Sequence, residues 1–232
     1  MAESYGNFRF GNDISILPYV EAVNIACGFH GGDPLTIVNT IESALELGKE
    51  IGAHPSFPDL VGFGRRNMDL SCEELSAVLT YQICAIKSIT ESLGGKLNHV
   101  KVHGALYNRA WSDINVAEII LKSIHKIDPS LIVFAPFNSC MADLSIKHGL
   151  TLKNESFADR LYTDAGRLSS RDISGSTLET PEKILAQVEQ ILNGKIITNS
   201  GRSLDIKSDT ICFHSDNANV VDALILVKSK FK

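Results

Sequence analysis

Short apolar runs alternate along the chain with longer segments that have the spacing of a helix. The apolar runs predict strands at 22–28, 50–55, 97–104, 131–136, 150–156 and 210–214. The segments between them predict helices at 33–48, 72–93, 104–126, 138–148, 180–193 and 217–230. A small hairpin is expected at 195–206. Strand-then-helix repetition favours a parallel sheet with right-handed crossovers, and both a barrel and an open doubly wound sheet fit it.

Two helix starts carry clear capping signals. Asp33 is a good N-cap for the helix that follows, and Pro34 suits its first position. Ser71 and Glu74 have the spacing of a capping box. The apolar stripe of the 33–48 helix is expected at Leu35, Val38, Ile41 and Leu45.

Composition describes an ordinary globular chain and excludes several classes of partner. With 232 residues, of which 44% are hydrophobic and 21% charged, a single domain over 1–232 is expected. A net charge of −5 argues against a nucleic-acid or anionic-membrane surface. Five scattered cysteines without a CxxC pair fit neither a disulfide nor a zinc framework. Free thiols suggest a reducing compartment, so we expect a cytoplasmic protein, and no secretory signal or membrane-length apolar segment is recognisable.

Ionisable side chains recur where the predicted strands end. These positions are His30, His54, His103, Glu155 and His214. In parallel α/β folds such strand ends converge on one rim, so the five side chains are expected in a common pocket. Each one alone has a simpler explanation, as a turn residue or a hydrogen-bonded core histidine. Five together are hard to explain by packing, because burial of such groups is costly unless they are paired.

These groups suit acid–base chemistry on a small anionic substrate. Histidine titrates near neutral pH, and carboxylates can act as bases, orient histidines or hold a metal. Lysine and arginine can bind a carboxylate or phosphate. The carboxylate candidates are Asp33, Asp59, Glu155, Asp159 and Asp216, and the cationic candidates are Lys101, Arg65, Arg160 and Arg171. The chain has no GxxxxGK[ST] loop, GxGxxG turn, GxSxG elbow or HExxH helix, so any nucleotide chemistry cannot use a P-loop.

Several blocks of the chain resemble one family closely. "NIACGFHGGDP", "GAHPSFPDLVGFGRR", "HVKVHGALYN", "FADRLY" and "DTICFHSD" follow one another in the order and spacing of the LamB/YcsF family. The resemblance implies an irregular seven-stranded β/α barrel of the glycoside hydrolase and deacetylase type. It also implies ATP-dependent opening of the lactam ring of 5-oxo-L-proline to glutamate, with ATP as cofactor and with partner B and C subunits.

The same resemblance suggests roles for individual residues. It implies proton transfer or substrate orientation by His30, His54 and His103, with Asp33 and Asp59 in support. Lys101 and Arg160 are implied as anion contacts, and His214 and Asp216 as residues that close the rim. Arg65, Arg66, Glu155 and Asp159 complete the expected substrate-binding set.

The start of the chain departs from the family pattern. The family usually begins with a D-x-N-x-D strand just before a segment like "MAESYGNF", and this chain begins at that junction. The first strand is therefore expected to be missing, and the natural protein to be longer. In the related deacetylases an aspartate of that strand helps to bind metal, so a divalent metal is left open, with unknown ligands. The alternatives are a metal-dependent, deacetylase-like carbohydrate hydrolase and a non-catalytic binding subunit.

Overall fold

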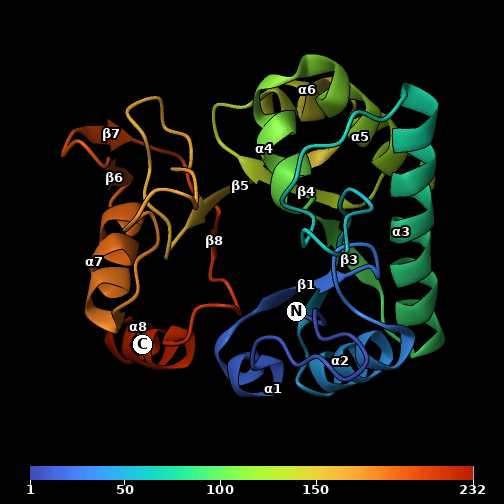
Figure 1. The fold of residues 1–232 in the computed structure, drawn as a ribbon, viewed down its shortest axis with the longest axis horizontal. Coiled ribbons are helices and arrows are strands. Elements are labelled where there is room, and N and C mark those ends of the chain that lie inside the picture. Colours follow the sequence, from blue (N-terminus) through green and yellow to red (C-terminus); the bar gives the residue numbers. More distant parts are fainter. Residues whose placement is uncertain (232) are drawn as a thin grey trace. The chain divides into compact units, whose positions relative to one another are not determined.

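The computed structural model describes residues 1–231 and divides into two compact units (Figure 1). The first unit comprises Met1–Lys153, and the second begins at Asn154. The expectation of a single domain over 1–232 stays a prediction. None of the helices in the described residues is both long enough and apolar enough to cross a bilayer.

The first unit is built on four parallel strands that neighbour one another in chain order. They are β1 (Ala22–Ala26), β2 (Glu50–His54), β3 (Leu97–Val100) and β4 (Ile132–Pro136). Ala26 pairs with His54, and Ala53 pairs with Val100, so the C-terminal ends of these strands meet at one edge of the sheet. The strands are mostly buried, which accounts for their continuous apolar runs.

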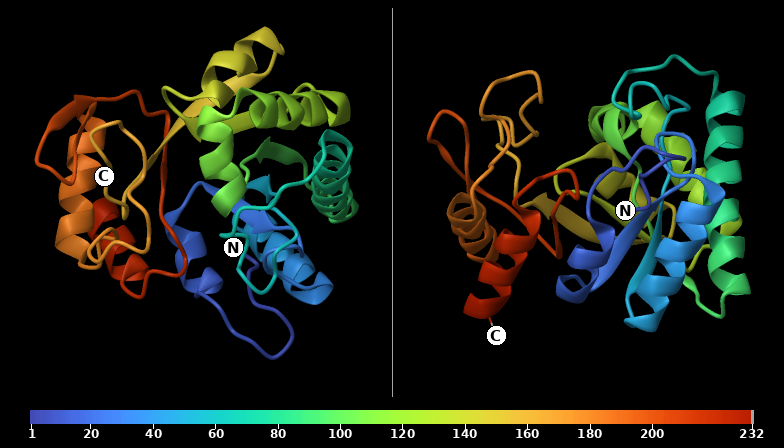
Figure 2. Two further views of the ribbon diagram at one scale, coloured as in Figure 1. Left: turned by 45° about the horizontal axis from the view of Figure 1, so that its top comes forward. Right: turned by 60° about the horizontal axis from the view of Figure 1, so that its bottom comes forward.

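Helices cover this sheet in a β/α succession. They are α1 (Asp13–Ile16), the short 3-10 helix Leu17–Tyr19, α2 (Pro34–Glu46), α3 (Cys72–Ser92), α4 (Gly104–Ser112), α5 (Ile114–Ile127) and α6 (Cys140–Lys147). The long helix α3 packs against α5, which also packs against α6 (Figures 1 and 2). The predicted caps are confirmed: Asp33 accepts from the Thr36 amide, and Ser71 and Glu74 form a reciprocal capping box.

Two predictions about these helices are wrong in detail. The helix expected at 104–126 is two helices, because the Asp113 carboxylate caps a new one by accepting from the amides of Asn115 and Val116. The apolar stripe of α2 is also shifted. Leu35 is 69% exposed, and the buried positions are Ile37, Ile41 and Ala44.

The first residues of the chain lie alongside β1. The Met1 amino group donates to the Asn24 carbonyl at 2.8 Å, and the Ala26 amide donates to the Met1 carbonyl at 2.9 Å. Bonds from one residue to two residues spaced by two are the pattern of a parallel ladder. This pairing brings Glu3 to the C-terminal end of β1, where the edge of the sheet carries its polar side chains.

The second unit contains a parallel strand pair, a hairpin and two helices. Strand β5 (Thr151–Phe157) pairs with β8 (Thr210–Cys212), and β6 (Lys195–Ile197) pairs with β7 (Ser203–Asp205) as the predicted antiparallel hairpin. Helix α7 (Pro181–Leu192) packs against α8 (Val220–Lys230). Their contact forms the core of this unit, with Ala158, Ile184, Val188 and Ala223 fully or almost fully buried.

The strand order confirms an α/β fold with a parallel sheet. In the described residues the main sheet has six strands in the order β1-β2-β3-β4-β5-β8, and β6 and β7 form a separate pair. The count of seven strands that the resemblance implied is not confirmed.

Candidate functional site

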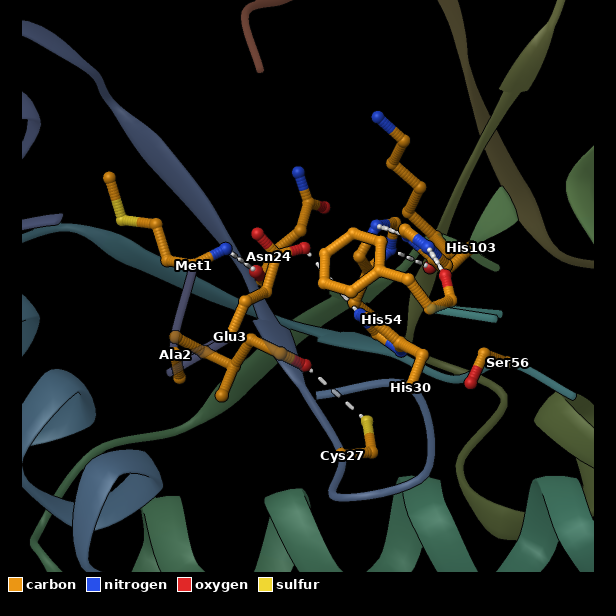
Figure 3. A network of polar contacts seen from close by, with 12 residues as sticks. Met1, Ala2, Glu3, Asn24, Cys27, His30, His54, Ser56 and His103 are labelled. Carbon is orange, nitrogen blue, oxygen red and sulfur yellow. Dashed lines mark hydrogen bonds and ion pairs between the residues drawn. The ribbon is translucent and has the colours of Figure 1, made fainter. Parts of the chain in front are cut away.

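Three of the predicted histidines come together at the strand ends of the first unit (Figure 3). His54 ends β2, His103 follows β3, and His30 lies in the turn after β1. The rings of His30 and His103 stack with centroids 3.8 Å apart, and the ring of His54 stands edge-on to His103 at 4.8 Å. All three side chains are buried. The structure therefore joins residues that are up to 73 positions apart in sequence, from His30 to His103.

Glycines allow the surrounding backbone to approach these rings. Gly32, in the turn that carries His30, has a φ of +87°, and a β-carbon there would lie 2.6 Å from the Ala2 carbonyl oxygen. Gly64 has a φ of +64°, and its β-carbon would lie 2.9 Å from the side chains of both His30 and His103. Only glycine fits these two positions without strain.

A carboxylate that the sequence reasoning missed faces this cluster. Glu3 Oε1 lies 3.5 Å from His30 Nε2, and the Glu3 side chain is only 10% exposed. Burial raises the pKa of Glu3, but the positive N-terminus and His30 outweigh burial, so the net shift is downward and the carboxylate is ionised. Burial lowers the pKa of His30, and Glu3 opposes that effect. Glu3 precedes the first predicted strand, so no strand-end pattern pointed to it.

His54 and His103 form a continuous hydrogen-bonded chain. His54 Nδ1 lies 2.6 Å from the Lys101 carbonyl oxygen, and His54 Nε2 lies 3.0 Å from His103 Nδ1. His103 Nε2 lies 2.9 Å from the Phe63 carbonyl oxygen. Burial, reinforced by neighbouring cationic groups, holds the pKa of both histidines well below the usual value. Both rings are therefore neutral near pH 7 and can accept a proton.

The loop between β2 and α3 uses two of the candidate residues to hold its own shape. Arg66 and Asp59 form an ion pair, in which Arg66 Nε donates to Asp59 Oδ1 at 3.0 Å. Asp59 also accepts from the Gly62 amide at 2.9 Å. The bonds from Arg66 lower the pKa of Asp59. Because the Asp59 carboxylate is already bound to its own loop, its visible role is to shape the turn beside the histidines.

Other candidates of the first unit surround the cluster or brace it. The Arg65 guanidinium lies over the Phe63 ring at 4.8 Å. The ammonium group of Lys101, a buried residue, lies 5.9 Å from the Tyr107 ring centre. Asp33 caps α2 and accepts from the Gly6 amide at 2.8 Å, so it ties the N-terminal segment to the helix. Backbone amides of Thr36 and Gly6 lower the pKa of Asp33.

The second unit holds its own acid–histidine pair. Asp159 accepts from the His214 backbone amide at 3.0 Å, and its other oxygen lies 2.7 Å from His214 Nδ1. Burial raises the pKa of Asp159, but His214 outweighs it, and the net shift is downward. This contact orients the imidazole of His214 and fixes its Nδ1 as a donor.

The remaining candidates also lie in the second unit. Asp216 and Arg171 are 3.5 Å apart. Arg160 is buried and donates to the Ser169 carbonyl at 2.5 Å, and Glu155 is buried on β5. The convergence of this set with the histidines of the first unit stays a prediction.

Glu3, His30 and His103 also form a group whose fit to a metal ion can be judged. One ligand atom from each lies within 4.8 Å of the others. A metal binds an imidazole nitrogen close to the plane of the ring, and the rings of His30 and His103 are parallel to within 3° and 3.8 Å apart. Their lone pairs therefore do not converge on one point, and both nitrogens of His103 already face hydrogen-bond partners. The residues as arranged do not fit a metal.

Cys27 lies beside the cluster but is not a nucleophile. Its Sγ is 3.4 Å from the Ile25 carbonyl oxygen, and burial raises the pKa of the thiol to about 12. The protonated thiol is unreactive. All five cysteines of the chain are free thiols.

Comparisons with known proteins identify relatives over the full chain. The LamB/YcsF family profile matches residues 1–232. A protein of Bacillus cereus (strain 03BB102), named as the A subunit of 5-oxoprolinase, is 40% identical, over 100% of this chain and 92% of that protein. A protein of the same name from Bacillus thuringiensis subsp. konkukian (strain 97-27) is 41% identical, over 95% of this chain and 88% of that protein.

A solved structure has the same fold. The lactam utilization protein of Thermus thermophilus superimposes with a TM-score of 0.92 and 38% sequence identity, over 100% of this chain and 94% of that one. The match of the family profile to the whole chain and the identity to these relatives agree with the blocks that surround the three histidines. The chain belongs to the LamB/YcsF family.

Proposed function

We propose that this chain supplies the ring-opening site of an ATP-dependent 5-oxoprolinase, in which 5-oxo-L-proline is converted to L-glutamate. Relatives about 40% identical over nearly their whole length are named as the A subunit of 5-oxoprolinase. The observation that carries the proposal is the buried group of His30, His54 and His103, whose pKa values are lowered by burial. Neutral imidazoles at a strand-end site are suited to proton transfer near pH 7.

The chemistry needs both activation and proton transfer. A lactam is a stable amide, so water attacks its carbonyl carbon slowly unless that carbon becomes more electrophilic. Transfer of the ATP γ-phosphoryl group to the lactam carbonyl oxygen, with release of ADP, activates that carbon. Water then adds to it, the C–N bond breaks, and both protons of the water end on the nitrogen, one through a base and one as the carbonyl re-forms, which leaves an acyl phosphate and an ammonium group. A second water cleaves the resulting acyl phosphate, so one ATP and two waters yield glutamate, ADP and phosphate.

The roles are divided between this chain and its partners. The three histidines of the first unit move the proton, and Lys101 contacts the anionic substrate. The Asp159–His214 pair, Arg160 and Asp216 lie in the second unit and stay predicted site residues. We assign ATP to partner subunits of the B and C type, because this sequence has no P-loop. Five free thiols fit a reducing, cytoplasmic setting.

The direct test is release of glutamate from 5-oxoproline and ATP by this chain mixed with its B and C partners. We expect turnover that requires this chain and that falls at least about tenfold in a His30→Asn variant. The matched control is Ser71→Ala, a helix cap outside the histidine cluster, which should keep turnover. Turnover that is unchanged without this chain would contradict the proposal. Full activity of His30→Asn would instead show that His30 takes no part in the proton transfer.

A further inference from the structure

His54 and His103 make three hydrogen-bond contacts, but two neutral imidazoles carry only two N–H protons to fill them. The chain of contacts runs from the Lys101 carbonyl through His54 and His103 to the Phe63 carbonyl. A carbonyl oxygen only accepts, so each outer contact needs a proton on the imidazole nitrogen. The contact between the two rings needs a third proton. Two neutral imidazoles carry only two, so one of the three contacts lacks a proton until the pair takes one up.

Distance and burial decide which contact lacks the proton in the neutral pair. The contact of His54 Nδ1 with the Lys101 carbonyl is the shortest, at 2.6 Å, and is fully buried. A bare nitrogen facing that oxygen would be strongly unfavourable, so His54 carries its proton on Nδ1 and presents a lone pair at Nε2. His103 then donates from Nδ1 to His54. The bare nitrogen is His103 Nε2, at the outer, partly buried end of the chain.

We propose that His103 Nε2 is the atom that accepts the proton from the attacking water, and that His54 is a positioning residue that holds His103 in the tautomer protonated on Nδ1. This inference rests on the proposed function. The water O–H bond breaks, its oxygen bonds to the ring carbon of the lactam, and its proton passes to His103 Nε2. When the C–N bond breaks, the same proton passes from His103 to the ring nitrogen. The second proton of the water leaves the hydroxyl group as the carbonyl re-forms, and the freed amine takes it up as ammonium.

The Phe63 carbonyl stabilises the protonated state. Its distance of 2.9 Å from His103 Nε2 is that of an N–H···O hydrogen bond, so the carbonyl accepts a hydrogen bond from the Nε2–H group once His103 is protonated. Phe63 has a φ of +55°, which is a strained conformation for a residue with a side chain. The loop carbonyl is thus held where it can accept a hydrogen bond from the conjugate acid.

Titratable and charged groups from four segments of the chain face this pair. Glu3 and the Met1 amino group come from the N-terminal segment, His30 comes from the turn after β1, Arg65 from the loop after β2, and Lys101 from the segment after β3. Glu3 favours protonation of His103, and His30 and Arg65 oppose it. His103 therefore holds its added proton weakly and can pass it on to the substrate.

Nitrogen NMR of the isolated full chain tests the tautomer directly. Long-range proton–nitrogen spectra distinguish a neutral imidazole protonated on Nδ1 from one protonated on Nε2. Near pH 7.5 we expect His103 to carry its proton on Nδ1 and to take up the next proton on Nε2 as the pH falls. A neutral His103 with its proton on Nε2 would overturn the inference, whatever the activity of the complex.

Two substitutions of His54 test whether this residue sets the tautomer of His103 or only supports the fold. His54→Gln can place an amide oxygen near the Nε2 position, where it accepts from His103 Nδ1. His54→Asn keeps a donor for the Lys101 carbonyl but does not reach His103. We expect the glutamine variant to keep the His103 tautomer and most of the turnover, and the asparagine variant to shift the tautomer and lose at least about tenfold in kcat.

The pH profile completes the test with the partner subunits present. Turnover of the unaltered chain should fall on acidification with a midpoint that matches the NMR midpoint of His103. If the midpoint of turnover differs clearly from the NMR midpoint of His103, then His103 is not the base. The inference also fails if His103 has the same tautomer in the two His54 variants. If the unaltered chain has the expected tautomer but no turnover with 5-oxoproline, the proposed function fails and the hydrogen-bond assignment stands.

Discussion

Gly104 lies directly against the carbonyl oxygen of Gly64, and a β-carbon at position 104 would be 2.3 Å from that oxygen. The neighbouring Ala105 amide donates to the same oxygen at 2.9 Å. This contact joins the residue after His103 to the residue after Phe63. It therefore fixes the loop carbonyl of Phe63 against the His103 ring.

We expect Gly104→Ala to lower both stability and turnover. Gly104 has a φ of +58°, which costs an alanine about 1–3 kcal/mol, and the clash with Gly64 adds to this. Gly149→Ala is the matched control, because Gly149 has a φ of +68° but nothing lies within 4 Å of the place that a β-carbon would take. Urea denaturation and turnover with the partner subunits measure both effects. If the two variants have equal stability and equal turnover, the Gly104–Gly64 contact contributes to neither.

The buried imidazole of His99 should make the protein less stable in acid. Burial lowers the pKa of His99 to about 3, whereas the unfolded chain titrates near 6.5. Between these values the unfolded state binds one more proton than the folded state, so the free energy of unfolding falls as the pH falls. His30, His54 and His103 act in the same direction.

A His99→Gln variant isolates this contribution. His99 Nε2 lies 3.1 Å from Asn24 Oδ1, a contact that the glutamine amide can replace. From pH 7 to pH 5 the variant should lose about 2 kcal/mol less stability than the unaltered chain. His125→Gln, at an exposed position of α5, serves as the control for a histidine-to-glutamine substitution. Chemical denaturation at the two pH values provides the comparison, and parallel losses in all three proteins would disprove this account.

The capping box of α3 gives a test of stability without an effect on chemistry. Ser71 Oγ accepts from the Glu74 amide, and the Glu74 carboxylate accepts from the Ser71 amide at 2.8 Å. Ser71→Ala leaves the first helical amides without that acceptor and should cost about 1 kcal/mol. The measurement is the midpoint of urea denaturation together with turnover. A loss of turnover without a loss of stability would contradict the purely structural role.

The Asp159–His214 pair of the second unit should matter for turnover. Asp159→Asn removes the negative charge beside His214 Nδ1 and replaces one acceptor oxygen by an amide donor. The imidazole therefore loses its fixed orientation. We expect turnover to fall at least about tenfold while the fold, measured by circular dichroism, is kept.

Asp172→Asn is the control for this prediction. Asp172 is an exposed carboxylate of the same unit and bonds to Ser170. It should keep full turnover. If Asp159→Asn keeps it as well, the acid–histidine pair is structural.

The strand pattern predicts the fold class and the three clustered histidines, because both depend on where apolar runs stop. The caps at Asp33 and Ser71 are equally visible in the sequence, since capping depends on residue type and local spacing. The break between α4 and α5 at Asp113 is not visible in the sequence, because the apolar period of α5 continues that of α4 and hides the new N-cap.

Other features depend on contacts that residue type does not reveal. Glu3 reaches His30 only because the N-terminal residues pair with β1. The Phe63 carbonyl is a backbone acceptor, so no motif marks it. The charges of Asp59 and Arg66 suggest site residues, and the structure shows that the two bind each other.

The high pKa of Cys27 has a practical consequence for chemical labelling. Alkylating reagents react with thiolates, and this thiol stays protonated at any pH at which the protein would be handled. Cys72 and Cys84 are exposed and will take up a probe first. Spin labels or fluorophores can therefore be attached to α3 while the interior next to the imidazoles is left untouched.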